Sequence, residues 1–112
     1  MLLAGLVLLA AGPALAHSLL LESTPAAGAT VPTSPSTLML RFNNRIEKPL
    51  SRVRLVDSTG TKQPLTLSPD GSADRLVATV PALAPGTWRV EWQVLSTDGH
   101  VVAGRFQFKV AP

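Results

Sequence analysis

Residues 87–94 read Thr-Trp-Arg-Val-Glu-Trp-Gln-Val, and this stretch decides the fold class of the chain. Large apolar side chains occupy every second position, at Trp88, Val90, Trp92 and Val94. Successive side chains of a β-strand point to opposite faces, so the pattern predicts a strand with one face in a core and the other in water. We expect both tryptophans on the inward face, as part of the core.

The same alternation recurs on both sides of this strand. It covers residues 38–43, 52–55 and 105–110, and the Leu- and Val-rich segments 18–22 and 75–80 also favour strands. Clusters of proline, glycine, serine and threonine separate these segments, and none of the segments after residue 16 has an apolar repeat of 3.6 residues. The pattern predicts an all-β fold, an immunoglobulin-like Greek-key β-sandwich or barrel of about seven strands.

The beginning of the chain has a different composition. Residues 2–12 are apolar and uncharged, Pro13 interrupts the run, and Ala14-Leu15-Ala16 matches the small-x-small box of a signal-peptide cleavage site. The run is shorter than the roughly 20 apolar residues that cross a bilayer. No Lys or Arg precedes it, and an uncleaved anchor is the alternative. We expect a cleaved signal peptide over residues 1–16 and one exported, periplasmic domain over residues 17–112.

The charged residues and the composition disfavour several classes of function. Ten Lys and Arg and seven Asp and Glu give a formal net charge of +3, without a block of one sign along the sequence. A nucleic-acid footprint needs a clustered basic patch with aromatic residues, so we expect no nucleic-acid partner. The sequence has no cysteine, which excludes thiolate metal sites and disulfide bonds. It also has no nucleophile elbow, P-loop or dinucleotide-binding fingerprint.

Two histidines, His17 and His100, are the best candidates for metal ligands. After the expected cleavage His17 is the first residue, and its α-amine and Nδ1 can close a chelate ring on one ion. Asp98 and His100 are two positions apart, which places them on one face of an extended segment, and Gly99 permits a close turn. Three nitrogens and one carboxylate oxygen favour Cu(II) or Ni(II) over Zn(II), Ca(II) or Mg(II). Asp-Gly is also a common turn dipeptide without any ligand role.

Several blocks of the chain match a known family. They are His17–Leu19, Ser23–Gly28, Leu40–Asn43, Pro85–Trp92, Val94–His100 and Gly104–Val110. The last two are the most specific, because they are similar to the ending G-T-Y-x-V-x-W-x-V-x-S-x-D-G-H … G-x-F-x-F-x-V. On these residues the chain resembles the CopC family of periplasmic copper-resistance proteins. The resemblance implies one Cu(II) ion held by the amine and imidazole of His17, the imidazole of His100 and the carboxylate of Asp98.

Two positions depart from the pattern of that family. Some members have a methionine-rich loop that binds Cu(I), whereas Met39 is the one methionine after residue 16 here, so we expect no cuprous thioether site. Many relatives have a glutamate where this chain has Asn44, which removes one oxygen donor from that strand.

We interpret the chain as a monomeric copper carrier or buffer in copper resistance or homeostasis. The resemblance implies an inner-membrane copper transporter of the CopD type as a partner in trans. One alternative is a metal-free immunoglobulin-like interaction or chaperone domain, in which both histidines are incidental. The other is a histidine-brace copper monooxygenase. Two tryptophans, three phenylalanines and no tyrosine offer little aromatic surface for a polysaccharide, and Asp98 would fill the position that oxygen needs, so we expect no enzyme.

Overall fold

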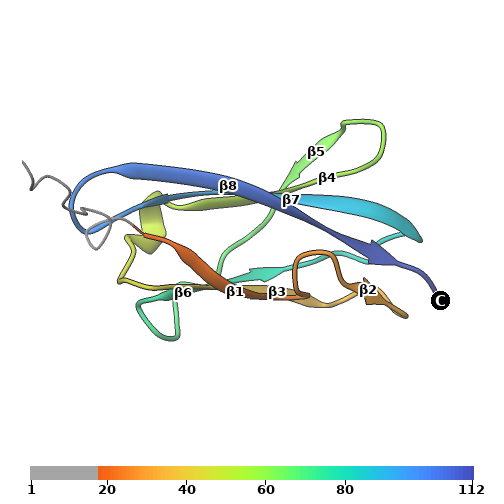
Figure 1. The fold of residues 1–112 in the computed structure, drawn as a ribbon, viewed down its shortest axis with the longest axis horizontal. Coiled ribbons are helices and arrows are strands. Elements are labelled where there is room, and N and C mark those ends of the chain that lie inside the picture. Colours follow the sequence, from red (N-terminus) through yellow and green to blue (C-terminus); the bar gives the residue numbers. More distant parts are fainter. Residues whose placement is uncertain (1–17) are drawn as a thin grey trace, which may run out of the picture.

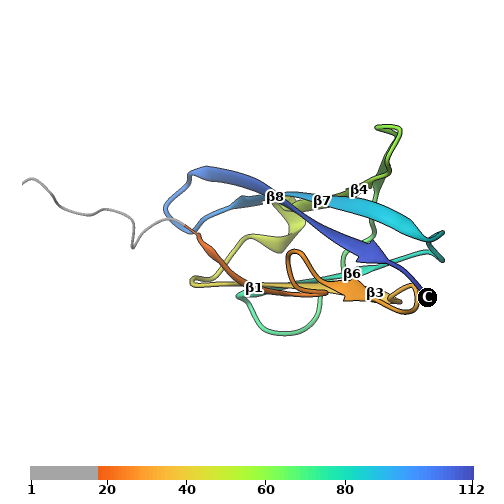
Figure 2. The ribbon, with the colours of Figure 1, turned by 45° about the vertical axis from the view of Figure 1, so that its right-hand side comes forward.

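Residues 18–112, the part of the chain that the computed structural model describes, form two β-sheets packed face to face (Figure 1, Figure 2). The smaller sheet has the strand order β1-β3-β6, and the larger sheet has the order β2-β8-β7-β4-β5. The strands are β1 (Leu20–Thr24), β2 (Thr30–Val31), β3 (Thr37–Phe42), β4 (Arg52–Val56), β5 (Lys62–Pro64), β6 (Arg75–Thr79), β7 (Gly86–Leu95) and β8 (Val101–Val110). A short 3-10 helix, η3 (Lys48–Leu50), precedes β4. The predicted all-β sandwich is confirmed.

The stretch that decided the fold class lies in the middle of the larger sheet. β7 pairs with β8 from Gly86 opposite Val110 to Leu95 opposite Val101, and with β4 on its other edge. Trp92 is buried, as predicted, with 8% of its surface exposed. Trp88 is only half-buried, because its indole Nε1 donates to the carbonyl of Ala84 at 3.0 Å, in the turn before the strand. The prediction that both tryptophans belong to the core is therefore right for Trp92 and partly right for Trp88.

The core lies between the two sheets and is built from the alternating positions. Its fully buried members in the strands are Leu38, Leu40, Phe42, Val53, Leu55, Leu76, Ala78, Val90, Val94 and Phe108. The rings of Phe42 and Trp92 meet edge to face across the sheets, with centroids 5.2 Å apart and planes at 73°. Such aromatic pairs add directional contacts to the burial of apolar area, and this pair joins β3 to β7.

Two short strands at the edges of the larger sheet were not predicted. β2 pairs with β8 in parallel, and β5 pairs with β4 and ends at Pro64. Strands of two and three residues at an edge have too few buried side chains to give an alternating signal. The first predicted strand is shifted as well, since β1 begins at Leu20 rather than at Ser18.

The beginning of β1 and the turn between β7 and β8 lie at the same end of the sandwich, opposite the C-terminus (Figure 1). The chain thus brings two segments that are far apart in sequence to one end of the molecule. Among the described residues, none of the helices has the length and apolarity to cross a membrane.

Candidate metal centre

The turn between β7 and β8 carries Asp98 and His100. The Gly99 N–H donates to the Ser96 carbonyl at 3.0 Å, and the Ser96 N–H donates to the His100 carbonyl at 2.9 Å, which closes a hairpin loop of three residues. Gly99 has φ +88°, the left-handed backbone that a loop of this length requires and that glycine adopts without strain. The sequence Asp-Gly-His therefore folds as a tight reverse turn at the tip of the longest strand pair.

The turn holds the Asp98 carboxylate against His100. Oδ1 of Asp98 accepts the backbone N–H of His100 at 3.0 Å, and Oδ2 lies 2.9 Å from His100 Nδ1. The His100 side chain is 64% exposed and the Asp98 side chain 21%. A carboxylate that accepts the Nδ1 proton fixes the ring orientation and the tautomer that has its lone pair on Nε2. This is a common arrangement around metal-binding histidines.

The first described residues are attached to the other end of the same turn. Ser18 and Ser96 are buried polar residues with 0% and 1% exposure. The Ser18 N–H donates to Ser96 Oγ at 3.0 Å, and Ser96 Oγ donates to Ser18 Oγ at 2.9 Å. Buried polar groups are stable only when they have hydrogen-bond partners, so this pair fixes the position of Ser18 beside the end of β7.

A second pair of hydrogen bonds holds the next residue against the end of β3. The Leu19 N–H donates to Asn43 Oδ1 at 2.7 Å, and the Asn43 N–H donates to the Leu19 carbonyl at 3.0 Å. An isolated bridge between Ile46 and Ser96 joins the segment after β3 to the end of β7. The segment before β1 is thereby fixed from two sides, by β7 and by the residues that follow β3.

Of the three predicted ligands, the structure brings Asp98 and His100 together, whereas His17 lies outside the described residues. Within residues 18–112, there is no group of three or more His, Cys, Asp or Glu side chains that could hold a metal ion. A site with more than two side-chain ligands of these types therefore needs a donor from outside this range. Met39, on β3, is partly buried.

Two positioning residues, Ser96 and Asn43, were not predicted from the sequence. Ser96 continues the inward series Val90, Trp92 and Val94, and a serine at an inward position has to find a partner. The inward position of Ser96 could therefore have indicated a buried hydrogen bond, although it does not reveal that the partner is Ser18, 78 residues earlier. The bond between Asn43 and Leu19 has no counterpart in the sequence pattern, because it depends on how β1 lies beside β3.

Comparison with known proteins gives consistent matches. The family model described as the CopC domain matches residues 20–111. "Copper resistance protein C" of Xanthomonas campestris pv. juglandis is 34% identical over 113 residues, which cover 91% of this chain and 86% of that protein. "Protein YobA" of Escherichia coli K12 is 32% identical over 101 residues, covering 85% and 79%. The crystal structure of CopC from Methylosinus trichosporium OB3b has a TM-score of 0.79 and 34% identity, covering 86% of this chain and 95% of that one.

Proposed function

The chain belongs to the CopC family of copper-binding resistance proteins, which are not enzymes, and we propose that it binds one Cu(II) ion and acts as a carrier or buffer. A copper-related function follows from the family. The proposed ligands are the amine and imidazole of His17, the imidazole of His100 and the carboxylate of Asp98. The observation that carries this proposal is the attachment of Ser18 to Ser96, two residues before Asp98.

The attachment limits the distance between the two parts of the proposed site. Neighbouring Cα atoms are about 3.8 Å apart across a trans peptide bond. Because His17 directly precedes Ser18 in the chain and Ser18 is hydrogen-bonded to Ser96, covalent geometry keeps His17 near Ser96. A metal site formed by a chain terminus gains affinity when the terminus is held in place before binding, because less conformational entropy is lost. The buried hydroxyls of Ser18 and Ser96 supply this restraint.

The second support is the contact between Asp98 and His100. With Nδ1 facing Asp98, the Nε2 atom of His100 is the nitrogen that would bind the ion. Nδ1 and Nε2 point away from each other across the ring, so Asp98 would have to leave Nδ1 in order to supply an oxygen to the same ion. The donors are nitrogen and oxygen, which favour Cu(II), whereas Cu(I) prefers thioether and thiolate sulfur.

An exposed site suits the transfer of copper to another protein. The His100 imidazole is largely accessible, so a partner can approach the ion without opening the fold. We propose that residues 1–16 are a cleaved signal peptide, and that the domain over residues 17–112 acts in the periplasm as a monomer. A membrane copper transporter of the CopD type is the proposed partner.

Acetylation of the α-amine of His17, in a chain that begins at this residue, tests the proposal. The acetyl group converts the free amine into an amide, while every described residue is unchanged. We expect a loss of Cu(II) affinity greater than the roughly 10- to 100-fold that the loss of an outer-shell partner of a metal ligand costs, measured by competition titration with a chromophoric chelator. The matched control is the same chain with its α-amine free.

Equal affinity of the acetylated chain and of the control would exclude the amine ligand. Mass determination of the exported protein gives an independent check, since a mature form that does not begin at His17 would contradict the proposed processing. Tight binding of Cu(I) in the same type of titration would contradict the nitrogen and oxygen donor set and would point to Met39.

A further inference from the structure

The outer face of the larger sheet gathers most of the basic residues of the chain. Strands β4, β5, β7 and β8 direct alternate side chains away from the core. Six of these outward side chains are cationic: Arg52, Arg54, Lys62, Arg89, Arg105 and Lys109. The sequence shows no block of like charge, because the cluster forms only when four strands lie side by side.

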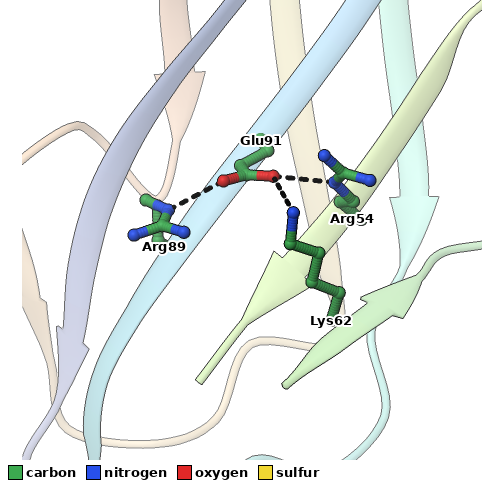
Figure 3. A network of polar contacts seen from close by, with 4 residues as sticks. All are labelled: Arg54, Lys62, Arg89 and Glu91. Carbon is green, nitrogen blue, oxygen red and sulfur yellow. Dashed lines mark hydrogen bonds and ion pairs between the residues drawn. The ribbon is translucent and has the colours of Figure 1, made fainter. Parts of the chain in front are cut away.

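One carboxylate, Glu91, accompanies these six cations on the outward positions of the four strands. It lies in the middle of the sheet between Arg54 at 2.7 Å, Arg89 at 2.9 Å and Lys62 at 3.9 Å (Figure 3). The hydrogen bond from Arg54 is the main cause that lowers the pKa of Glu91, so its carboxylate stays ionised. Even so, these strands carry five more positive than negative charges.

The smaller sheet differs in this respect. Its outward arginines are matched by carboxylates, with Arg41 2.6 Å from Glu22 and Arg75 4.0 Å from Asp74. Since the whole chain has a formal net charge of +3, the residues outside the four strands are net negative. The molecule therefore has one strongly basic side, and a charged surface would orient it.

The cations are spread over the face instead of converging on one point. Along β7 they extend from the row of Arg52 and Gln93 to the row of Thr87 and Lys109, about 20 Å for six residues of extended strand. An open groove of about 350 Å³ lies at one end of this area, lined by residues that include Arg52, Arg54 and Arg105. Guanidinium groups bind phosphate oxygens with paired hydrogen bonds, so the groove has the chemistry of a phosphate site.

We infer that this face, defined by Arg52, Arg54, Lys62, Arg89, Arg105 and Lys109, adsorbs to an anionic phospholipid bilayer. A bilayer offers continuous negative charge and needs no matching of individual positions, which fits cations spaced across four strands. A protein partner would be expected to meet an exposed apolar centre. The exposed positions between these cations include the polar residues Thr87, Gln93 and Gln107, and Val56, which lies between Lys62 and Arg89, is only 1% exposed. The inference does not depend on the proposed copper ligands.

Co-sedimentation with vesicles tests this inference, using the chain that begins at His17, which contains both sheets and the whole core. We expect binding to vesicles of phosphatidylcholine and phosphatidylglycerol (about 3:1), none to phosphatidylcholine alone, and loss of binding as NaCl rises and the Debye length falls below about 10 Å. R52Q/R105Q should lower the partition coefficient about 25-fold, since each basic residue near an anionic surface contributes about fivefold.

The matched control is R41Q/R75Q, which removes the same charge from the smaller sheet and should change the partition coefficient less than about threefold. His100→Ala should leave vesicle binding unchanged, so failure of the copper site and failure of this inference are distinguishable. Circular dichroism confirms that each variant is folded.

Three outcomes would overturn the inference. One is an equal loss of vesicle binding in both double variants, which would show a dependence on net charge alone. Another is binding of polyglutamate without binding of anionic vesicles, which would indicate an acidic protein partner. The third is release from vesicles by millimolar inorganic phosphate but not by NaCl of equal ionic strength, which would indicate a site for a free anion.

Discussion

Replacing Ser96 by alanine should weaken copper binding without touching any proposed ligand. The change removes the acceptor of the Ser18 N–H and the donor to the Ser18 hydroxyl, at 3.0 Å and 2.9 Å. Ser18 is 0% exposed, so both of its polar groups lose a partner that water cannot easily replace. Leaving a buried polar group unsatisfied costs about 1–3 kcal/mol.

The expected loss has two readouts. A reduction of about 1–3 kcal/mol in the free energy of unfolding lowers the Tm by roughly 4–8 °C per kcal/mol in a domain of this size. If copper binds only when the segment before β1 is attached, the same free energy lowers the Cu(II) affinity by up to about 5- to 150-fold. Urea unfolding measures the first quantity, and competition titration with a Cu(II) chelator measures the second.

Ser51→Ala is the matched control for this prediction. Ser51 is also buried, with 8% exposure, and its Oγ donates to the Glu47 carbonyl at 2.9 Å, before β4. It should lower the stability by a similar amount and leave the Cu(II) affinity unchanged. If Ser96→Ala bound Cu(II) as tightly as the unchanged chain, the attachment of Ser18 to Ser96 would have no role in copper binding.

Three further predictions concern the copper affinity of the site, the packing of the core and the stability of the fold at acidic pH. His100→Ala should lower the Cu(II) affinity more than Asp98→Ala, for which we expect a loss of about 10- to 100-fold in competition titrations. Circular dichroism should show that both variants are folded. Gly104→Ala should destabilise the fold by about 1–3 kcal/mol in urea, because its Cβ would lie 2.4 Å from Cζ2 of Trp92. Since the folded pKa of Glu91 lies below its ordinary value of 4.5, its ion pairs stabilise the fold fully above pH 4.5, and this stabilisation is lost as the pH falls from there through the lower folded pKa. Glu91→Gln should therefore reduce the acid-induced loss of stability, measured by urea unfolding at several pH values.

Most of the fold could be predicted from one local rule, the alternation of apolar and polar residues. The rule succeeds at β3, β4, β7 and β8, because one face of each strand is buried against the other sheet. It fails at β2 and β5, which lie at the edges of the larger sheet and bury little. It also overestimates the burial of Trp88, because the rule does not account for a hydrogen bond that holds the indole near the surface.

The candidate site was predictable only in part, for a related reason. Asp98 and His100 are neighbours in sequence, so their contact follows from the turn that Gly99 permits. The positioning residues Ser96 and Asn43 form hydrogen bonds with residues 78 and 24 positions away in the sequence. These residues come into contact only when the sheets assemble. The basic face is a similar case, because its members are scattered over residues 52–109 and meet only in the sheet.

The proposed site would give the copper ion a structural role. The segment before β1 leads into the smaller sheet, whereas Asp98 and His100 lie in the turn of the larger sheet. An ion bound by His17 and His100 would join the two sheets at one end of the sandwich, in a chain without cysteine to form a disulfide bond there. The hydrogen bonds between Ser18 and Ser96 link the two sheets at this point, beside the bridge between Ile46 and Ser96. Copper would then stabilise the fold by mass action, by about 2.7 kcal/mol at a free concentration 100 times its Kd, and this gain would be lost on transfer to a partner.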